Sequence, residues 1–152
     1  MAVDCGIELK KYNITVLSLW LGSVATEGFV DFCNSMNDDE VFLKEMFGRE
    51  VKMNTIKEMR KEAESVEFAG KCVVHLALNN NINKLNSKIV VAEDYAQSHG
   101  IKDIDNRVVP SFRQINAGLK LVLPKPLKVL ALLVPNFIKI PMFAIELFTS
   151  RF

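Results

Sequence analysis

One short turn holds the residues whose types and spacing could support ligand binding. They directly follow an apolar run and comprise Gly22, Ser23, Val24 and Thr26. A glycine lets the backbone approach a ligand closely, and the amide groups of such a turn point outward. From these residues alone two alternatives stay open, since Gly22 could simply end a strand and Thr26 could cap a helix.

Other reactive residue types are scattered and form no recognisable site. His75 and His99 are far apart in the sequence, as are the three cysteines, Cys5, Cys33 and Cys72. These spacings fit neither zinc ligation nor a disulfide framework, and no cysteine has the neighbouring base or cations that would lower the pKa of its thiol. We therefore predict no metal site and a reducing, intracellular setting.

The composition favours one folded core and argues against general nucleic-acid binding. Hydrophobic residues make up 49% of the 152 residues, which is enough material for the core of one domain. The 19 basic and 18 acidic residues give a net charge of +1, which is no electrostatic footprint for nucleic acid. The densest charge run, residues 58–64, is predicted to be a solvated helix face.

Two short strands separated by a helix are predicted to position the turn. Residues 14–20 form an apolar run that suggests a strand buried on both faces, and residues 87–92 suggest a second strand. Ser65 can cap the helix between them, which runs to Leu78. We assign its apolar face to Val66, Ala69, Val73, Leu76 and Ala77. This order predicts part of a parallel βαβ unit.

The segment between the turn and this helix, residues 29–64, is predicted to act as a lid. It contains one or two helices with an apolar stripe made of Phe42, Leu43, Met46 and Phe47. Such a lid could close over a substrate and exclude water.

The composition changes at Pro110, and residues 110–152 are predicted to form a hydrophobic extension. Prolines and lysines interrupt its apolar stretches, at Pro124, Pro126, Pro135, Pro141, Lys120, Lys125, Lys128 and Lys139. A membrane-spanning helix needs about 20 mostly apolar residues, and no such uninterrupted stretch exists here. The extension could lie in a membrane interface, dock on a partner protein or pack as an ordinary core.

The order of strand, turn and threonine in residues 8–27 resembles the sixth strand and the Pro-Gly-x-Val-x-Thr turn of the short-chain dehydrogenase/reductase family. Residues 65–78 resemble that family's penultimate helix, and residues 86–93 its seventh strand. The resemblance implies an α/β fold, namely the C-terminal part of a Rossmann-like three-layer αβα architecture with its last two parallel strands. Residues 1–109 would be a truncated family core. Leu21 departs from the family's proline, which removes a fixed backbone angle from the turn.

The resemblance also implies a role for the turn in binding NAD or NADP. In the family the turn's backbone, here at Val24, pairs with the nicotinamide carboxamide, and its threonine, here Thr26, hydrogen-bonds to the cofactor. Gly22 and Ser23 complete the expected cofactor-binding segment. The complete enzyme would oxidise or reduce an alcohol or carbonyl group of a hydrophobic small molecule.

The family's catalytic residues have no counterpart among these 152 residues. The Gly-rich loop, the catalytic Ser and the Tyr-x-x-x-Lys motif are missing, because neither Tyr12 nor Tyr95 is followed by Lys four positions later. In the family these residues tune proton transfer to the substrate oxygen. We therefore assign no catalytic residue and expect the chain alone to be inactive.

A second hypothesis is a non-catalytic protein that contacts a membrane or a partner through the extension. The expected location is the cytoplasm or the cytoplasmic face of the endoplasmic reticulum. A parallel strand without its neighbours exposes backbone groups and an apolar face, so we also expect self-association.

Overall fold

The computed structural model describes residues 1–41, 52–116, 119, 127–131 and 133–149. The apolar stripe predicted at Phe42, Leu43, Met46 and Phe47 lies outside these residues. The chain divides into two compact units, Met1–Val109 and Pro110–Phe152, which are described separately. The assignment of the first unit as a truncated family core and of the second as an extension stays a prediction.

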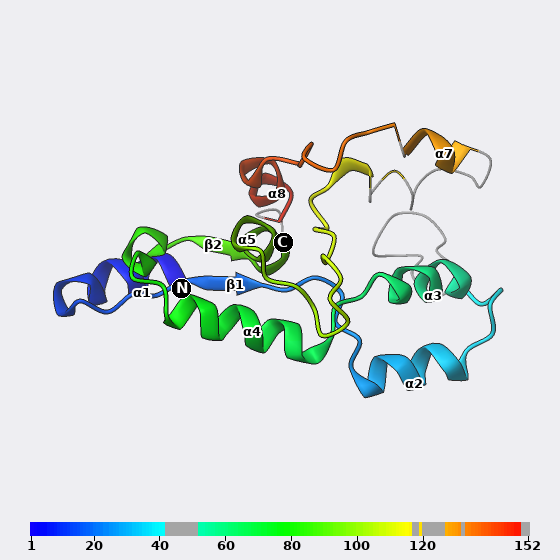
Figure 1. Cartoon of the computed structure of the whole chain (residues 1–152), viewed down its shortest axis with the longest axis horizontal. Coiled ribbons are helices and arrows are strands. Elements are labelled where there is room, and N and C mark those ends of the chain that lie inside the picture. Colours follow the sequence, from blue (N-terminus) through cyan, green and yellow to red (C-terminus); the bar gives the residue numbers. More distant parts are fainter. Residues whose placement is uncertain (42–51, 117–118, 120–126, 132, 150–152) are drawn as a thin grey trace. The chain divides into compact units, whose positions relative to one another are not determined.

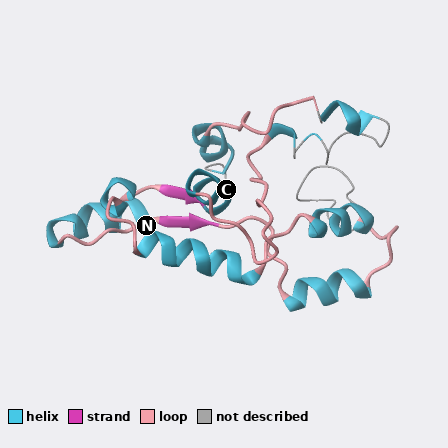
Figure 2. Ribbon diagram, in the orientation of Figure 1, coloured by secondary structure: helices cyan, strands magenta, loops and turns pink. Residues whose placement is uncertain are grey.

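Two parallel strands form the sheet of the first unit. Strand β1 (Ser18–Trp20) pairs with β2 (Ile89–Val91), with Ser18 opposite Ile89 and Trp20 opposite Val91. Helix α4 (Val66–Ala77) lies between them in the sequence and runs alongside both strands, as Figures 1 and 2 show. The predicted fold class, a partial Rossmann-like αβα arrangement with two parallel strands, is confirmed.

The first strand is shorter and less buried than predicted. All three residues of β1 are half-buried, and Ile14, which was expected to lie inside the strand, is exposed. Just before β1, Val16 N donates its hydrogen bond to the side-chain Oδ1 of Asn86, at 2.8 Å, and not to a backbone carbonyl of a neighbouring strand. Among the described residues β1 pairs with β2 alone, and the partial exposure of its three residues shows that the expected burial on both faces is wrong.

Helix α4 begins as predicted but buries a different face. Ser65 caps it, since the Ser65 hydroxyl accepts a hydrogen bond from Phe68 N at 3.1 Å. Of the predicted face Leu76 is buried, together with Phe68 and Cys72, whereas Val66 and Val73 are exposed. Both sets fit a helical period, so the sequence pattern could not decide between them. The strands decide, because Leu19 packs against the buried set.

Helix α5 (Ala92–His99) follows β2 without a loop and completes the main core. Ala92 and Ala96 pack against Phe68 and Cys72 of α4. The helix ends at Gly100, whose φ of +69° is a left-handed conformation that suits glycine.

The remaining helices of the first unit precede β1 or lie between the elements of this core in the sequence. Helix α1 (Ala2–Leu9) continues into a 3-10 turn, η1 (Lys10–Tyr12), and a second turn, η2 (Ile82–Leu85), precedes β2. Helices α2 (Glu27–Ser35) and α3 (Met53–Lys61) form a separate pair. Cys33, Met53 and Ile56 make the core of this pair. The predicted lid segment therefore contains helices with a small core of their own.

The second unit contains helices α7 (Lys128–Ala131) and α8 (Met142–Thr149). An antiparallel contact joins its beginning to its middle, because Ile115 N donates to Ile138 O at 3.1 Å and Ile140 N donates to Arg113 O at 2.8 Å. Several large apolar side chains of this unit are exposed. Within the part of the chain that the structure describes, none of the helices has the length and hydrophobicity needed to traverse a bilayer.

Candidate functional site

The predicted ligand-binding turn lies at the C-terminal end of β1 and is held by the residue that precedes the cap of α4. Glu64 N donates to Ser23 O at 2.8 Å, and Ala25 N donates to Glu64 O at 2.9 Å. These two bonds form a parallel bridge between Val24 and Glu64. In open α/β sheets ligands bind at the carboxyl ends of the strands, so the turn stands where a ligand site is expected.

Val24 and Thr26 keep capacity to bind a ligand. The Val24 carbonyl accepts a hydrogen bond from Thr26 N at 2.9 Å, and a carbonyl oxygen can accept a second one. The Thr26 hydroxyl accepts from Phe29 N at 3.3 Å, which leaves its hydrogen to donate elsewhere. Thr26 is therefore the cap of α2, as its alternative interpretation held, and its exposed hydroxyl is also accessible to a ligand.

Thr26→Ala is expected to lower the free energy of unfolding by about 0.5–1 kcal/mol, because α2 loses its capping hydroxyl. Thr26→Ser keeps the hydroxyl and is expected to unfold like the original chain. Urea denaturation followed by the fluorescence of Trp20, the single tryptophan of the sequence, measures both. Equal midpoints for the Ala and Ser variants would show that the cap contributes nothing.

The space beside Gly22 is occupied by a buried carboxyl group of the protein itself. A Cβ atom at position 22 would lie 2.2 Å from Oε1 of Glu93. The sequence predicted that glycine would admit a ligand, and the structure places the Glu93 side chain in close approach on the Cβ side. The need for glycine at this position thus has an internal cause.

Two buried carboxyl groups adjoin Gly22 and were missed by the sequence interpretation. Glu64 and Glu93 are each 1% exposed. Burial, followed by the negative charges of Glu93 and Asp103, raises the pKa of Glu64 to about 7, while the Gly22 amide weakly opposes this rise. Burial also raises the pKa of the Cys72 thiol to about 11, with smaller contributions from Glu64 and Glu93. For Cys72, this raised pKa agrees with the expectation that its thiol is unreactive.

Glu64 corrects the prediction that residues 58–64 form a solvated helix face. Helix α3 ends at Lys61, so Glu64 lies on the connection between α3 and α4 and pairs its backbone with the turn. The pairing draws its side chain inward. The predicted helix cap at Ser65 could have indicated this pairing, because it places Glu64 directly before the helix, where the backbone is extended and can pair with a neighbouring strand.

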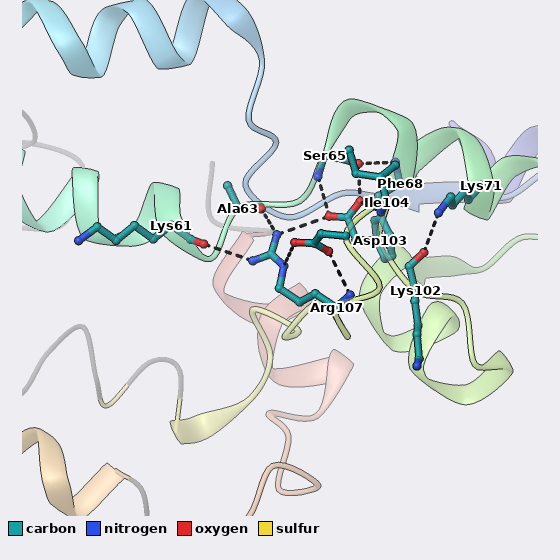
Figure 3. A network of polar contacts seen from close by, with 10 residues as sticks. Lys61, Ala63, Ser65, Phe68, Lys71, Lys102, Asp103, Ile104 and Arg107 are labelled. Carbon is teal, nitrogen blue, oxygen red and sulfur yellow. Dashed lines mark hydrogen bonds and ion pairs between the residues drawn. The ribbon is translucent and has the colours of Figure 1, made fainter.

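A polar network, drawn in Figure 3, fixes the backbone at Ala63 and Ser65, the two sequence neighbours of Glu64. Asp103 accepts hydrogen bonds from Ser65 N at 3.0 Å, from the Ser65 hydroxyl and from Ile104 N at 2.7 Å. Arg107 donates to Ala63 O at 2.6 Å and lies 3.4 Å from Asp103. Burial raises the pKa of Asp103, but the bonds from Ser65 and Ile104 and the charge of Arg107 outweigh it, so the pKa is lowered.

The other polar features that the structure describes lie apart from the predicted turn. A shallow hollow lies near the opposite ends of the strands and is lined by Lys10, Asn13, Ile14, Thr15, Asn83 and Asn86, none of which belongs to the predicted turn. Among the residues that the structure describes, no three His, Cys, Asp or Glu side chains are placed to hold a metal ion. His75 Nδ1 lies 2.9 Å from the Tyr95 hydroxyl, in a local contact between α4 and α5.

Comparison with known proteins gives relatives but no match to a family model. The chain is 33% identical to human dehydrogenase/reductase SDR family member 1, over its whole length and 45% of that protein. The mouse protein of the same name is also 33% identical over the whole chain and 45% of its own length. The chain therefore spans about half the length of these relatives. The resemblance to the short-chain dehydrogenases/reductases is thereby confirmed, for a chain that matches a C-terminal part of these proteins.

Proposed function

We propose that this chain supplies the nicotinamide side of the cofactor site, and part of the substrate site, of an NAD(P)-dependent short-chain oxidoreductase. The observation that carries the proposal is the position of the Gly22–Thr26 turn, at the carboxyl end of β1 in a chain that is 33% identical to such relatives along its whole length. The substrate would be a hydrophobic small molecule with a carbonyl or alcohol group.

The roles of the turn residues follow from their contacts. Val24 would meet the carboxamide of NAD or NADP through its backbone, and Thr26 would donate its hydroxyl hydrogen to the cofactor. Gly22 and Ser23 bring the backbone to this position, and the bridge to Glu64 keeps it there. A bound nicotinamide cofactor supplies or accepts the hydride.

The substrate side would be formed by α2, α3 and the wall beside Trp20. The separate core of α2 and α3 lets this pair act as one body, as a closing lid requires. Trp20 ends β1 two residues before Gly22 and is half-buried, so its indole can form an apolar pocket wall. Oxidation or reduction of the substrate would depend on the family's catalytic Ser and Tyr-x-x-x-Lys motif, which have no counterpart in these 152 residues.

The test is fluorescence titration of NADPH and NADH against two proteins. The first is the 152-residue chain, and the second is a chimera in which this chain replaces the matching segment of the human relative. We expect saturable binding and reduction of a hydrophobic carbonyl compound by the chimera, and neither by the chain alone. In the chimera Thr26→Ala should weaken cofactor binding about tenfold, the effect of one lost hydrogen bond.

Two controls separate cofactor contact from damage to α2. Thr26→Ser keeps the hydroxyl and should bind like the unmodified chimera. Ser35→Ala removes a hydroxyl that bonds to Phe32 O at 2.9 Å at the other end of α2, and it should leave the dissociation constant unchanged. Tight binding by the chain alone, or equal affinities for the Thr26 variants, would mean that the cofactor site lies elsewhere.

A second candidate function, peripheral contact with an intracellular membrane or a partner, is favoured by the second unit. Leu133, Phe137 and Phe143 are exposed there, and such apolar side chains bind membrane interfaces and protein surfaces. Cosedimentation with anionic vesicles tests the membrane alternative, with a Phe137→Ser, Phe143→Ser double variant as the comparison. Equal sedimentation of both proteins would remove support for it.

A further inference from the structure

We infer that Arg107 is a positioning residue for the Gly22–Thr26 turn and, through the turn, for the nicotinamide end of the cofactor. Arg107 lies far from the turn in the sequence and acts on it through the backbone of Ala63 and Glu64. Its hold on the turn follows from contacts within the first unit. Its effect on cofactor affinity rests on the proposed function.

The turn is joined to the connection between α3 and α4 by two backbone hydrogen bonds. Glu64 N donates to Ser23 O at 2.8 Å, and Ala25 N donates to Glu64 O at 2.9 Å. Val24, whose backbone is proposed to meet the carboxamide, lies between the two bonded residues of the turn. A displacement of Glu64 therefore moves the backbone atoms that face the cofactor.

Arg107 and the turn hold the two ends of one peptide group. The guanidinium Nη2 of Arg107 donates to Ala63 O at 2.6 Å, as drawn in Figure 3. This carbonyl and the Glu64 N–H, which donates to Ser23 O, belong to the same peptide bond. Because a peptide group is planar and rigid, rotation of its carbonyl turns its N–H as well. The bond from Arg107 thus sets the direction in which Glu64 N points at the turn.

The charge of Arg107 also strengthens the bond between this peptide group and the turn. A charged donor forms a stronger hydrogen bond than a neutral one, and bonds at the two ends of a peptide group polarise each other. Ala63 and Glu64 are 6% and 1% exposed, so few water molecules can compete for these bonds. Removal of the guanidinium weakens both ends at once.

The loop of Arg107 fixes the guanidinium in this orientation. Asp103 Oδ2 lies 3.4 Å from Nη2 and Asp105 Oδ2 lies 3.3 Å from Nε, while Nη1 donates to Lys61 O at 3.2 Å. The backbone closes the loop, because Asp103 N donates to Arg107 O at 3.0 Å. Arginine suits this position, since its planar group presents several N–H donors, whereas lysine carries its charge on one nitrogen.

The first experiment measures hydrogen exchange of backbone amides in the 152-residue chain. Arg107→Met keeps an unbranched apolar side chain but loses the guanidinium. The Glu64 and Ala25 amides, which form the bridge, should exchange about tenfold faster, the effect of one lost hydrogen bond. The Ser18 amide, which bonds to Lys88 O at 3.0 Å at the start of β1, should keep its protection.

Asn86→Ala is the matched control, because Asn86 also holds backbone groups, but before β1. Its Oδ1 accepts from Val16 N at 2.8 Å, and its Nδ2 donates to Gly6 O at 2.9 Å. This variant should speed exchange of the Val16 amide and leave the Ala25 amide unchanged. If Arg107→Met sped the exchange of all these amides equally, Arg107 would serve overall stability alone, and the inference would be overturned.

The second experiment measures binding of NADPH, NADH, ADP-ribose and the 2′-phosphate of ADP-ribose to the chimera. The last two ligands lack the nicotinamide that the turn is proposed to meet. Arg107→Met should therefore weaken cofactor binding about tenfold and leave the affinity for the ADP-ribose ligands unchanged. Arg107→Lys keeps the charge beside Asp103, so it should fold and lose a smaller part of the cofactor affinity. Asn86→Ala should bind all four ligands like the unmodified chimera.

The outcomes separate this inference from the proposed function. Unchanged cofactor affinity in Arg107→Met, or an equal loss for the ADP-ribose ligands, would overturn the role of Arg107 and leave the cofactor site in place. A chimera that binds neither cofactor would remove the proposed function and the effect of Arg107 on affinity. Hydrogen exchange in the 152-residue chain would still decide whether Arg107 holds the turn.

Discussion

Gly22→Ala is expected to lower the free energy of unfolding by about 2 kcal/mol, the usual cost of an extra methyl group in filled space. The new Cβ would lie 2.2 Å from Oε1 and 3.2 Å from Cδ of Glu93. Glu93 is almost fully buried, so it cannot yield without disturbing the turn. Urea denaturation monitored through Trp20 measures the loss.

Gly70→Ala is the matched control for this substitution. Gly70 lies in the middle of α4, and a Cβ there would meet nothing within 4 Å. Because alanine favours the helix over glycine, this variant should be about 1 kcal/mol more stable than the original chain. The same chemical change thus has opposite effects at two glycines of one unit.

A second substitution tests whether Glu93 is the cause of the cost at Gly22. Glu93→Ala removes the atoms that the new methyl group would meet. The double variant should lose less stability than the sum of the two single variants, by about 1–2 kcal/mol. Strict additivity would mean that the cost arises from the backbone of the turn.

The sequence predicted the parts of the fold that depend on local signals. The Ser65 cap, the helix after it and the branched strand residues 89–91 are encoded by neighbouring side chains, and the structure confirms them. The parallel pairing follows from the order of strand, helix and strand. The resemblance to the short-chain dehydrogenases/reductases rested on this same order and is confirmed by the relatives.

The parts that failed depend on contacts distant in sequence. The buried face of α4 could not be chosen without the position of Leu19, and the extent of β1 is limited by the side chain of Asn86. Glu64 looked like one more member of a charged run until its backbone was seen to pair with the turn. The predicted cofactor-binding residues Gly22, Ser23, Val24 and Thr26 stay a prediction, since only a ligand can test them.

The turn and the polar network act on the same three residues. Arg107 binds the carbonyl of Ala63, Glu64 pairs with the turn, and Ser65 donates two hydrogen bonds to Asp103. The connection from α3 to α4 is therefore held from one side by the network in Figure 3 and from the other by the turn. Weakening the network should release the turn as well.

Asp103→Ala is expected to lower the free energy of unfolding by about 3 kcal/mol. The carboxylate is 3% exposed and accepts bonds from Ser65 and Ile104, while Arg107 lies beside it. Its removal leaves buried donors and part of a cation without a partner, which is a costly change in a protein interior. Urea denaturation at neutral pH measures the loss.

Asp105→Ala is the matched control, because Asp105 pairs with the same arginine at 3.3 Å. The Asp105 side chain is 56% exposed, so water replaces its contacts and the loss should stay below about 1 kcal/mol. Similar losses for the two variants would show that burial of Asp103 does not determine its contribution.

The pKa of Asp103 is lowered and that of Glu64 is raised, so the two groups should make stability depend on pH in opposite directions. Hydrogen bonds and Arg107 hold the pKa of Asp103 below 3.8, so its stabilising effect is present above pH 3.8 and is lost as the pH falls through the lower folded value. The difference between the original chain and Asp103→Asn should therefore shrink in acid. The same variant removes a negative charge near Glu64 and should lower the pKa of that carboxyl. A Glu64 titration that does not move in Asp103→Asn would separate the network from the turn.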